Sequence, residues 1–270
     1  MFQLFFFLFG ACIGSFLNVV IYRYNTGMSI NGRSQCFSCG RQLQWFDMFP
    51  IFSFLAFRGR CRTCKSKIAW QYPLVEFITA ILFLALFYVD GFSIALPFDL
   101  VVFGLLIVMT VYDIRHKIIP DGLVTIFVVV GLLKMLAIFL QTGNFSLLNI
   151  LAGFIFYIPF YLLWKISDGR WIGLGDGKLA IGIGAFLGFE LGLTAIVVGF
   201  WTGAIFGVAY LALQKLASSA WFSRTKLGLF FARNSLTMKS ELPFAPFLIL
   251  GILIVFFSGF DLLLIGSFLQ

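Results

Sequence analysis

The first stretch long enough to cross a membrane is residues 2–22, which read FQLFFFLFGACIGSFLNVVIY. A helical span needs roughly 20 apolar residues, and this run contains no charged side chain. It is too long for the apolar part of a signal peptide, and Arg23 follows it instead of a small-residue cleavage site. We therefore expect a retained transmembrane helix at the start of the chain.

Apolar runs recur seven more times, at residues 73–89, 97–112, 122–140, 147–164, 178–190, 192–213 and 243–267. Of the 270 residues, 61% are hydrophobic and 11% are charged, whereas a soluble domain carries about 25% charged residues. This composition excludes an ordinary soluble globule and a disordered chain. We predict an all-α membrane protein with about eight transmembrane helices. Its predicted parts are a first helix at 1–22, a cytoplasmic loop at 23–70 and a polytopic helical domain at 71–270.

The positive charge is concentrated in alternate connections between the runs. The chain has 19 Lys and Arg against 11 Asp and Glu, a net charge of +8. The connections at 23–70, 113–121, 165–178 and 214–242 hold 18 of the 19 cations. Because basic loops stay in the cytoplasm, we expect both termini outside and these connections inside. The exception, Lys134, is expected to snorkel toward the outer surface. Residues 214–242 are expected to form an amphipathic interfacial stretch.

Four of the five cysteines form two CxxC pairs, Cys36 with Cys39 and Cys61 with Cys64, separated by 21 residues. This spacing is typical of a tetrahedral zinc site, and a metal would stabilise a loop that has little core of its own. Disulfides are disfavoured on the reducing side of the membrane, and no thioredoxin-like context supports a redox role. Cys12 is expected to be an inert packing residue. The basic charge of the loop is attributed to an anionic membrane surface rather than to nucleic acid.

Two aspartates lie at membrane depth near the predicted cytoplasmic ends of their helices. Asp113 ends the third run, and Asp176 precedes the sixth within the segment GLGDGK at 173–178. Facing aspartates can share a proton, so that one carboxylate activates a water molecule while the other polarises a peptide carbonyl. That is aspartic-protease chemistry. The alternative is that both aspartates cap helices or pair with Arg115 and Lys178.

The remaining polar groups have simpler interpretations. Asp121 is expected to cap the fourth helix, and Glu76 is either an N-terminal helix charge or a site residue. Asp99 and Glu190 fall near the predicted outer surface, where roles at helix ends suffice. His116 is expected to be a solvated loop residue.

These motifs together resemble those of the bacterial type IV prepilin peptidases, which are GxGD-type membrane aspartic proteases. The matching segments cover nearly the whole chain: GSFLNVVIYR at 14–23, the four-cysteine loop, YPLVE at 72–76, Asp113 with IPD at 119–121, GLGDGK at 173–178, and PFAPFL at 243–248. Ala245 stands where the family usually has glycine. The resemblance implies that Asp113 and Asp176 are catalytic. It also implies cleavage of the basic leader of type IV prepilins or type II secretion pseudopilins, in the bacterial inner membrane.

The resemblance implies a second activity as well. Members with the four-cysteine loop typically methylate the new N-terminal amine, using S-adenosylmethionine. Gly59 and Glu76 match positions associated with that activity, although Gly59 would equally turn the chain and Glu76 would equally favour a helix start. Residues 23–70 contain no GxGxxG motif and are too short for a βαβ methyltransferase domain, so the donor site must be built differently.

Two alternatives remain beside this interpretation. The first is a peptidase alone, with the cysteine loop as a zinc-stabilised docking module. The second is a transporter with Asp113 and Asp176 as ion ligands, which would favour polar groups near the bilayer midplane and inverted repeats. Neither of those two features is evident in the sequence. The expected partners are a prepilin substrate and the lipid bilayer, without nucleic acid.

Overall fold

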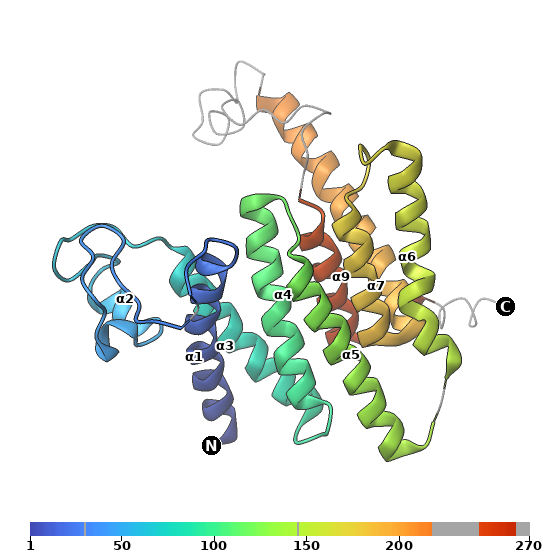
Figure 1. Ribbon diagram of the computed structural model, residues 1–270, viewed down its shortest axis with the longest axis horizontal. Coiled ribbons are helices and arrows are strands. Elements are labelled where there is room, and N and C mark those ends of the chain that lie inside the picture. Colours follow the sequence, from blue (N-terminus) through green and yellow to red (C-terminus); the bar gives the residue numbers. More distant parts are fainter. Residues whose placement is uncertain (30, 145, 218–242, 263–270) are drawn as a thin grey trace. The chain divides into compact units, whose positions relative to one another are not determined.

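A computed structural model describes residues 1–29, 31–144, 146–217 and 243–262. In these ranges the chain is helical, and its only β structure consists of isolated bridges. It divides into two compact units, Met1–Tyr112 with Val129–Phe145, and Asp113–Val128 with Ser146–Gln270. Figure 1 shows the order of the helices along the chain.

Six helices within the described ranges are long and apolar enough to cross a bilayer. They are α1 (Phe2–Arg23), α3 (Gln71–Asp90), α4 (Leu96–His116), α5 (Asp121–Thr142), α6 (Leu147–Ser167) and α7 (Leu174–Ala217). Helix α7 has 44 residues and contains two of the predicted runs. The shorter α9 (Ala245–Ser258) covers only the first part of the last run at 243–267, whose residues from 263 onward lie outside the described ranges. Each of the eight predicted runs therefore coincides wholly or in part with a helix, and the all-α membrane class is confirmed.

The adjoining runs at 178–190 and 192–213 predict a turn at the outer surface near 190–192, and the structure corrects this prediction in two ways. The break inside α7 is at Gly188, with φ of 76° and ψ of −167°, a conformation that a residue without Cβ adopts at little cost. No separate loop follows, because the helix resumes at once. The break frees the backbone N–H of Phe189, which donates to Asn149 Oδ1 at 3.0 Å. A side chain of α6 thus satisfies the kinked backbone of α7.

In the first unit, α1 and α3 pack almost backbone to backbone. A Cβ atom added at Gly10 would lie 2.8 Å from the Cα of Ala80, and one at Gly14 would lie 2.7 Å from the Cα of Glu76. Small residues are what allow membrane helices to approach this closely. Asn18 Nδ2 donates to the carbonyl of Tyr72 at 3.1 Å across the same interface. This packing fixes Glu76 beside the polar face of α1.

Lys134 and Asp99 form a buried ion pair in the first unit, which corrects two expectations. Lys134 Nζ lies 2.6 Å from Asp99 Oδ1, and the two side chains are 10% and 0% exposed. Lys134 therefore does not snorkel, and Asp99 is not a surface residue at a helix end. An unpaired charge at this depth would be costly, so the two charges neutralise each other between α4 and α5.

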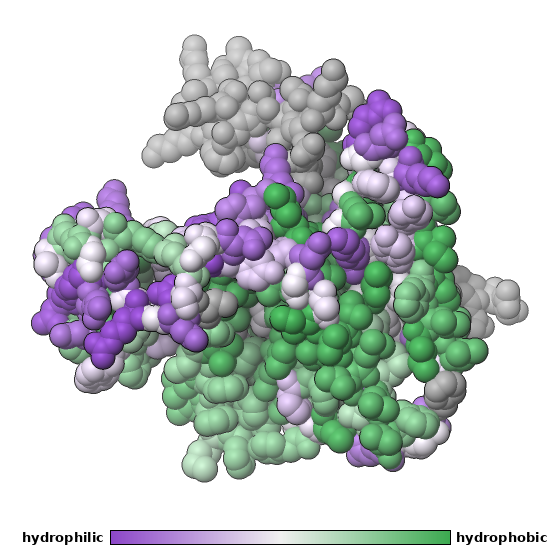
Figure 2. Space-filling view, in the orientation of Figure 1, coloured by the Kyte–Doolittle hydropathy of each residue, from purple (hydrophilic) through white to green (hydrophobic). Residues whose placement is uncertain are grey.

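Residues 23–70 contain only short helices, η1 (Trp45–Met48) and α2 (Phe52–Ala56). In Figure 2, hydrophilic residues gather on this segment, while hydrophobic residues cover the sides of the long helices. The predicted interfacial stretch at 214–242 lies outside the described residues from 218 onward, and so does the C-terminus at 263–270. Expectations about those residues stay predictions.

Glycines also mediate the packing in the second unit. A Cβ atom added at Gly153 of α6 would lie 2.7 Å from the carbonyl oxygen of Ile181 in α7. One added at Gly199 of α7 would lie 3.0 Å from the Cα of Leu248 in α9. Helix α7 thus packs closely on α6 before its break at Gly188 and on α9 after it. It begins at Leu174, four residues before the predicted start at 178.

Candidate functional site

Asp113 lies in the last turn of α4, in the second unit, and is 4% exposed. The backbone N–H of Ala245, at the start of α9, donates to its carboxylate. Its Oδ2 atom is buried and has no hydrogen-bond partner within the described part of the chain. Buried carboxylate oxygens are normally satisfied. The second oxygen is therefore placed to accept a hydrogen bond from a water molecule or a substrate.

Asp176 lies in the first turn of α7, in the same unit, and is 8% exposed. The backbone N–H of Gly173 donates to its carboxylate, and the charge of Asp113 acts unfavourably on it. The fold thus brings together two aspartates that are 63 residues apart in the sequence. Two carboxyl groups with repelling charges favour the state in which one of them holds a proton.

The connection between α4 and α5 packs against the turn that carries Asp176. A Cβ atom added at Gly175 would lie 3.2 Å from the Cβ of Ile119. Lys178 Nζ lies 2.7 Å from Asp121 Oδ1, so Lys178 bonds Asp121, which begins α5, rather than Asp176. These contacts hold the turn at 173–176 against the start of α5.

The two CxxC segments of the first unit adopt the same backbone fold. In the first, the N–H of Cys36 donates to the carbonyl of Arg41 at 2.9 Å, and the N–H of Gly40 donates back to Cys36 at 2.8 Å. In the second, Cys61 and Lys65 repeat this pattern with distances of 2.9 and 3.0 Å. The fifth position of each turn has a positive φ, 69° at Gly40 and 58° at Lys65. Each pair therefore forms a tight knuckle.

The four knuckle sulfurs converge on one point. The Sγ atoms of Cys36, Cys39, Cys61 and Cys64 all lie within 4.8 Å of one another, and no cysteine of the chain is in a disulfide. Cys36 and Cys64 are 3.8 Å apart, close to the separation of about 3.8 Å that tetrahedral zinc with 2.3 Å bonds requires. Backbone N–H groups of Cys39 and Ser38 lower the pKa of Cys36 to about 6. The cluster fits one thiophilic metal ion.

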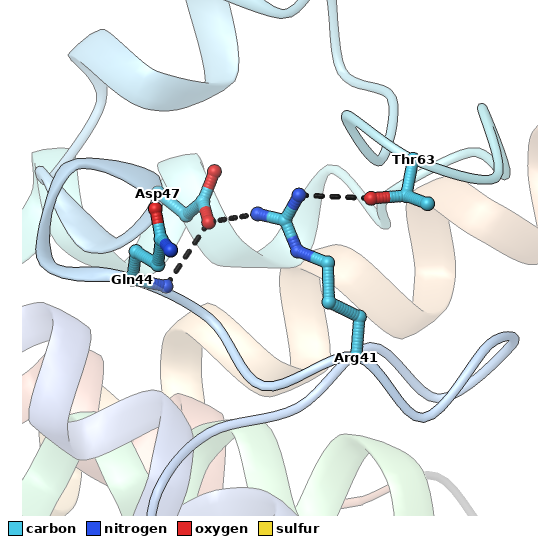
Figure 3. A network of polar contacts seen from close by, with 4 residues as sticks. All are labelled: Arg41, Gln44, Asp47 and Thr63. Carbon is cyan, nitrogen blue, oxygen red and sulfur yellow. Dashed lines mark hydrogen bonds and ion pairs between the residues drawn. The ribbon is translucent and has the colours of Figure 1, made fainter.

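A polar network joins the two knuckles to each other (Figure 3). Arg41 follows the first knuckle, and its guanidinium donates to Thr63 Oγ1 in the second at 2.8 Å. The same guanidinium pairs with Asp47, which also accepts from the backbone N–H of Gln44 at 3.0 Å. The network ties η1 to both knuckles.

A cavity of about 620 Å³ lies between α1, α3 and the cysteine segment, all within the first unit. Glu76 lines it, is 7% exposed, and accepts a hydrogen bond from the backbone N–H of Ile51 at 2.7 Å. Cys12 also lines it and is exposed, which corrects its expected packing role. Gly59 has a φ of +64°, and a Cβ there would lie 2.8 Å from Phe54. Gly59 therefore turns the chain into the second knuckle.

Comparisons with known proteins find matches along most of the chain. A profile of the bacterial peptidase A24 N-terminal domain matches residues 8–89, and a profile of the type IV leader peptidase family matches residues 100–208. Proteins named prepilin leader peptidase/N-methyltransferase are similar along most of the chain. The one from Bacillus subtilis is 31% identical over 94% of this chain and 93% of its own length.

The chain belongs to the type IV leader peptidase family. A relative of the same name from Pectobacterium carotovorum is 32% identical over 76% of this chain and 82% of its own length. One from Myxococcus xanthus is 34% identical over 78% of this chain, which spans 64% of that relative. No solved structure gives a significant match.

The candidate site residues of this leader peptidase fall in both of the segments that match the family profiles. Asp113 and Asp176 fall in the segment 100–208, and the four cysteines with Glu76 fall in the segment 8–89. Sequence reasoning missed the cavity itself. Its signal was present on α1, where Ser15, Asn18 and Tyr22 recur at helical spacing in an otherwise apolar run and all line the cavity.

Proposed function

We propose that this chain is a membrane aspartic endopeptidase that removes the basic leader of type IV prepilins or pseudopilins, with Asp113 and Asp176 as the catalytic pair. The observation that carries the assignment is the pairing of two buried, mutually repelling aspartates from α4 and α7. The family assignment supplies the substrate class.

The proposed peptidase step needs one ionised and one protonated carboxyl group. The ionised aspartate takes a proton from a water molecule as its oxygen attacks the scissile carbonyl carbon. The protonated aspartate donates a hydrogen bond, and then its proton, to the carbonyl oxygen. Collapse of the tetrahedral intermediate breaks the C–N bond, and the leaving amine takes a proton from the pair. The unpartnered Oδ2 of Asp113 is free to contact the attacking water.

The proposed location of this chemistry is the cytoplasmic face of the inner membrane, with both termini outside. Support comes from the 18 of 19 cations in alternate connections. The basic leader of a prepilin would stay in the cytoplasm while its apolar helix lies in the bilayer. In this scheme, residues 71–270 form the peptidase domain, residues 1–22 its first helix and residues 23–70 its cytoplasmic loop.

We assign zinc to the four-cysteine cluster in a structural role. Four thiolates around one ion leave no open coordination position for chemistry. The knuckle amides and the Arg41 network position the sulfurs, and the metal would stabilise a segment that contains only two short helices.

Methylation of the new N-terminal amine is the second proposed activity, and S-adenosylmethionine supplies the methyl group when bound. Glu76 and Gly59 are the residues that the resemblance assigns to it. Glu76 is buried at a cavity wall, whereas Gly59 shapes the second knuckle. The alternative is a peptidase with a zinc-stabilised docking loop and no methyl transfer.

The test is co-expression of this chain with a prepilin, followed by mass spectrometry of the pilin N-terminus. The proposal predicts loss of the leader and addition of one methyl group. Cleaved but unmethylated pilin favours the docking-module alternative. An intact leader contradicts the peptidase assignment.

A further inference from the structure

We infer that the cysteine segment is anchored in the surface of an anionic bilayer by an apolar patch on α2 and on the turn before it. The patch consists of Phe49, Phe52 and Leu55. This inference goes beyond the proposed peptidase and methyl-transfer activities, and it depends on neither of them.

The patch is exposed although it lies outside the long helices. The side chains of Phe49, Phe52 and Leu55 are 51%, 63% and 63% exposed. The rings of Phe49 and Phe52 are neighbours, with centroids 6.2 Å apart. Leu55 follows Phe52 by three residues in α2, so the two side chains share one face of the helix. Single exposed apolar residues need no explanation, but a contiguous exposed patch marks an interaction surface.

The opposite face of α2 packs toward the membrane helices. Phe54 is 9% exposed, and its ring centroid lies 5.0 Å from that of Trp70, the residue before α3. Ser53 and Phe54 line the cavity beside α1, whereas none of the three patch residues belongs to its lining. The patch therefore faces away from the cavity, and protein on the other side of α2 does not cover it.

The segment lies alongside the membrane helices rather than beyond their ends. The N–H of Ile51, between the patch residues in sequence, donates to Glu76 at 2.7 Å, and Glu76 is five residues inside α3. Five residues are about 7–8 Å along a helix. Phe16 lines the same cavity from α1, seven residues or about 10 Å before that helix ends. Interfacial helices insert to about 5–10 Å, which matches the depth of α2.

The charge of the segment selects the kind of bilayer. Residues 23–70 contain eight Lys and Arg and a single acid, Asp47, which pairs with Arg41. Arg58 and Arg60 come directly after α2, and both are exposed. Basic residues beside an inserted apolar patch bind anionic lipid headgroups. The patch and these charges together hold the cavity wall that the segment supplies against α1 and α3.

Photocrosslinking tests the anchor on the full chain in nanodiscs that contain equal amounts of phosphatidylglycerol and phosphatidylcholine. Phe52→p-benzoylphenylalanine places the reactive group in the patch. Phe37→p-benzoylphenylalanine is the matched control, because Phe37 is 70% exposed but lies beside Tyr22, at the end of α1. Mass spectrometry of the irradiated protein identifies the lipid adducts at each position.

Position 52 should give about fivefold more lipid adduct than position 37, because only the patch inserts. Its adducts should contain about threefold more phosphatidylglycerol than phosphatidylcholine, because of the basic residues. Adding Phe49→Asp and Leu55→Asp should abolish the adduct at position 52 and leave thermal unfolding unchanged, since both side chains are exposed.

No lipid adduct at position 52, or equal adducts at positions 37 and 52, overturns the anchor. Equal labelling of the two lipids overturns the preference for an anionic surface. An adduct at position 52 that survives the two Asp substitutions shows that the patch does not cause insertion, and it also overturns the inference. If added prepilin replaces lipid in the adducts at position 52, the patch is a protein-docking surface and the lipid assignment is wrong.

Discussion

Two ion pairs in this leader peptidase show how burial changes the energy of the same contact. Lys134 and Asp99 are 10% and 0% exposed, whereas Lys178 and Asp121 are 35% and 71% exposed. The N–O distances are nearly equal, 2.6 and 2.7 Å. Removing one partner of a buried pair leaves an uncompensated charge, while an exposed pair is screened by solvent.

Lys134→Met is therefore expected to lower the free energy of unfolding by about 3–5 kcal/mol, because it leaves the Asp99 carboxylate buried and unpaired. The measurement is reversible unfolding in mixed detergent micelles. Asp121→Asn is the exposed control and should cost less than about 1 kcal/mol. The double variant Asp99→Asn/Lys134→Met should recover much of the free energy of unfolding that Lys134→Met loses. An equal loss in the single and the double variant would argue against the ion pair.

At the residue scale, the sequence predicts the chemically distinctive groups well. Asp113, Asp176 and the four cysteines are recognisable because ionisable groups at membrane depth and paired CxxC motifs are rare. The Lys134–Asp99 pair is not predictable in the same way. Their helices are neighbours in sequence, but the rotation of each helix about its axis decides whether the two side chains meet.

At the scale of elements, close packing between α7 and α9 depends on Gly251 of α9 as well as on Gly199 of α7. A Cβ atom at Gly251 would collide with the carbonyl oxygen of Ala195 and lie 2.9 Å from the backbone nitrogen of Gly199. Backbone atoms cannot rotate away as a side chain can. This interface also places Ala245, at the start of α9, against Asp113.

Gly251→Ala is accordingly expected to destabilise the protein by about 1–3 kcal/mol, the usual cost of overpacking, and to reduce cleavage. Gly207→Ala in α7 is the control, because a Cβ there meets no atom within 4 Å. It should be neutral or stabilise by about 0.5–1 kcal/mol. Thermal unfolding with a parallel cleavage assay checks both changes. A neutral Gly251→Ala would mean that α9 does not pack as described.

The cysteine segment is the element whose folding should depend on metal. Purified protein is expected to contain about one zinc ion per chain, and Cys36→Ser combined with Cys61→Ser should remove it. Without metal, the segment 23–70 should become sensitive to protease while the helical circular dichroism changes little, because the long helices supply most of that signal, and α1 and α3 pack directly on each other at Gly10 and Gly14. Unchanged protease resistance in the metal-free protein would contradict a structural role for zinc.

Element boundaries were predictable only where composition changes sharply. The apolar runs located all the described long helices, yet the break at Gly188 was placed at 190–192. Apart from Glu190, the residues around Gly188 are apolar, so hydropathy does not mark the break at Gly188 itself. The contact with Asn149 that stabilises the kink comes from another helix, and one sequence without the fold cannot reveal it.

At the scale of the whole molecule, the distribution of charge predicts an orientation. Alkaline phosphatase folds only where its disulfides form, outside the cytoplasm. A fusion after Gly143, between α5 and α6, should be active, and a fusion after Lys117, between α4 and α5, should be inactive. The opposite pattern of activities would reverse the proposed topology and would place Asp113 on the wrong side for a cytoplasmic leader.

Fold class and family were predictable from the sequence as a whole, because hydropathy and ordered motifs span nearly its entire length. The division into two units was not. Two of its boundaries fall inside α4 and α5, at 112–113 and 128–129, and the third lies between α5 and α6, at 145–146. No loop or proline marks the two boundaries inside the helices. The cavity was missed for a related reason, since its walls come from two helices and a loop far apart in the chain.

The central claim is that Asp113 and Asp176 act together in peptide cleavage. The most direct measurement is the rate of leader removal from a purified prepilin by the full chain in nanodiscs, followed by mass spectrometry. The matched control is Asp168→Asn. Asp168 is exposed and has a left-handed backbone with a φ of 49°, which Asn also adopts. This variant should therefore cleave normally. Asp113→Asn and Asp176→Asn should each slow cleavage by about 100- to 10,000-fold while the protein stays folded. Retained cleavage in either folded variant would contradict the account.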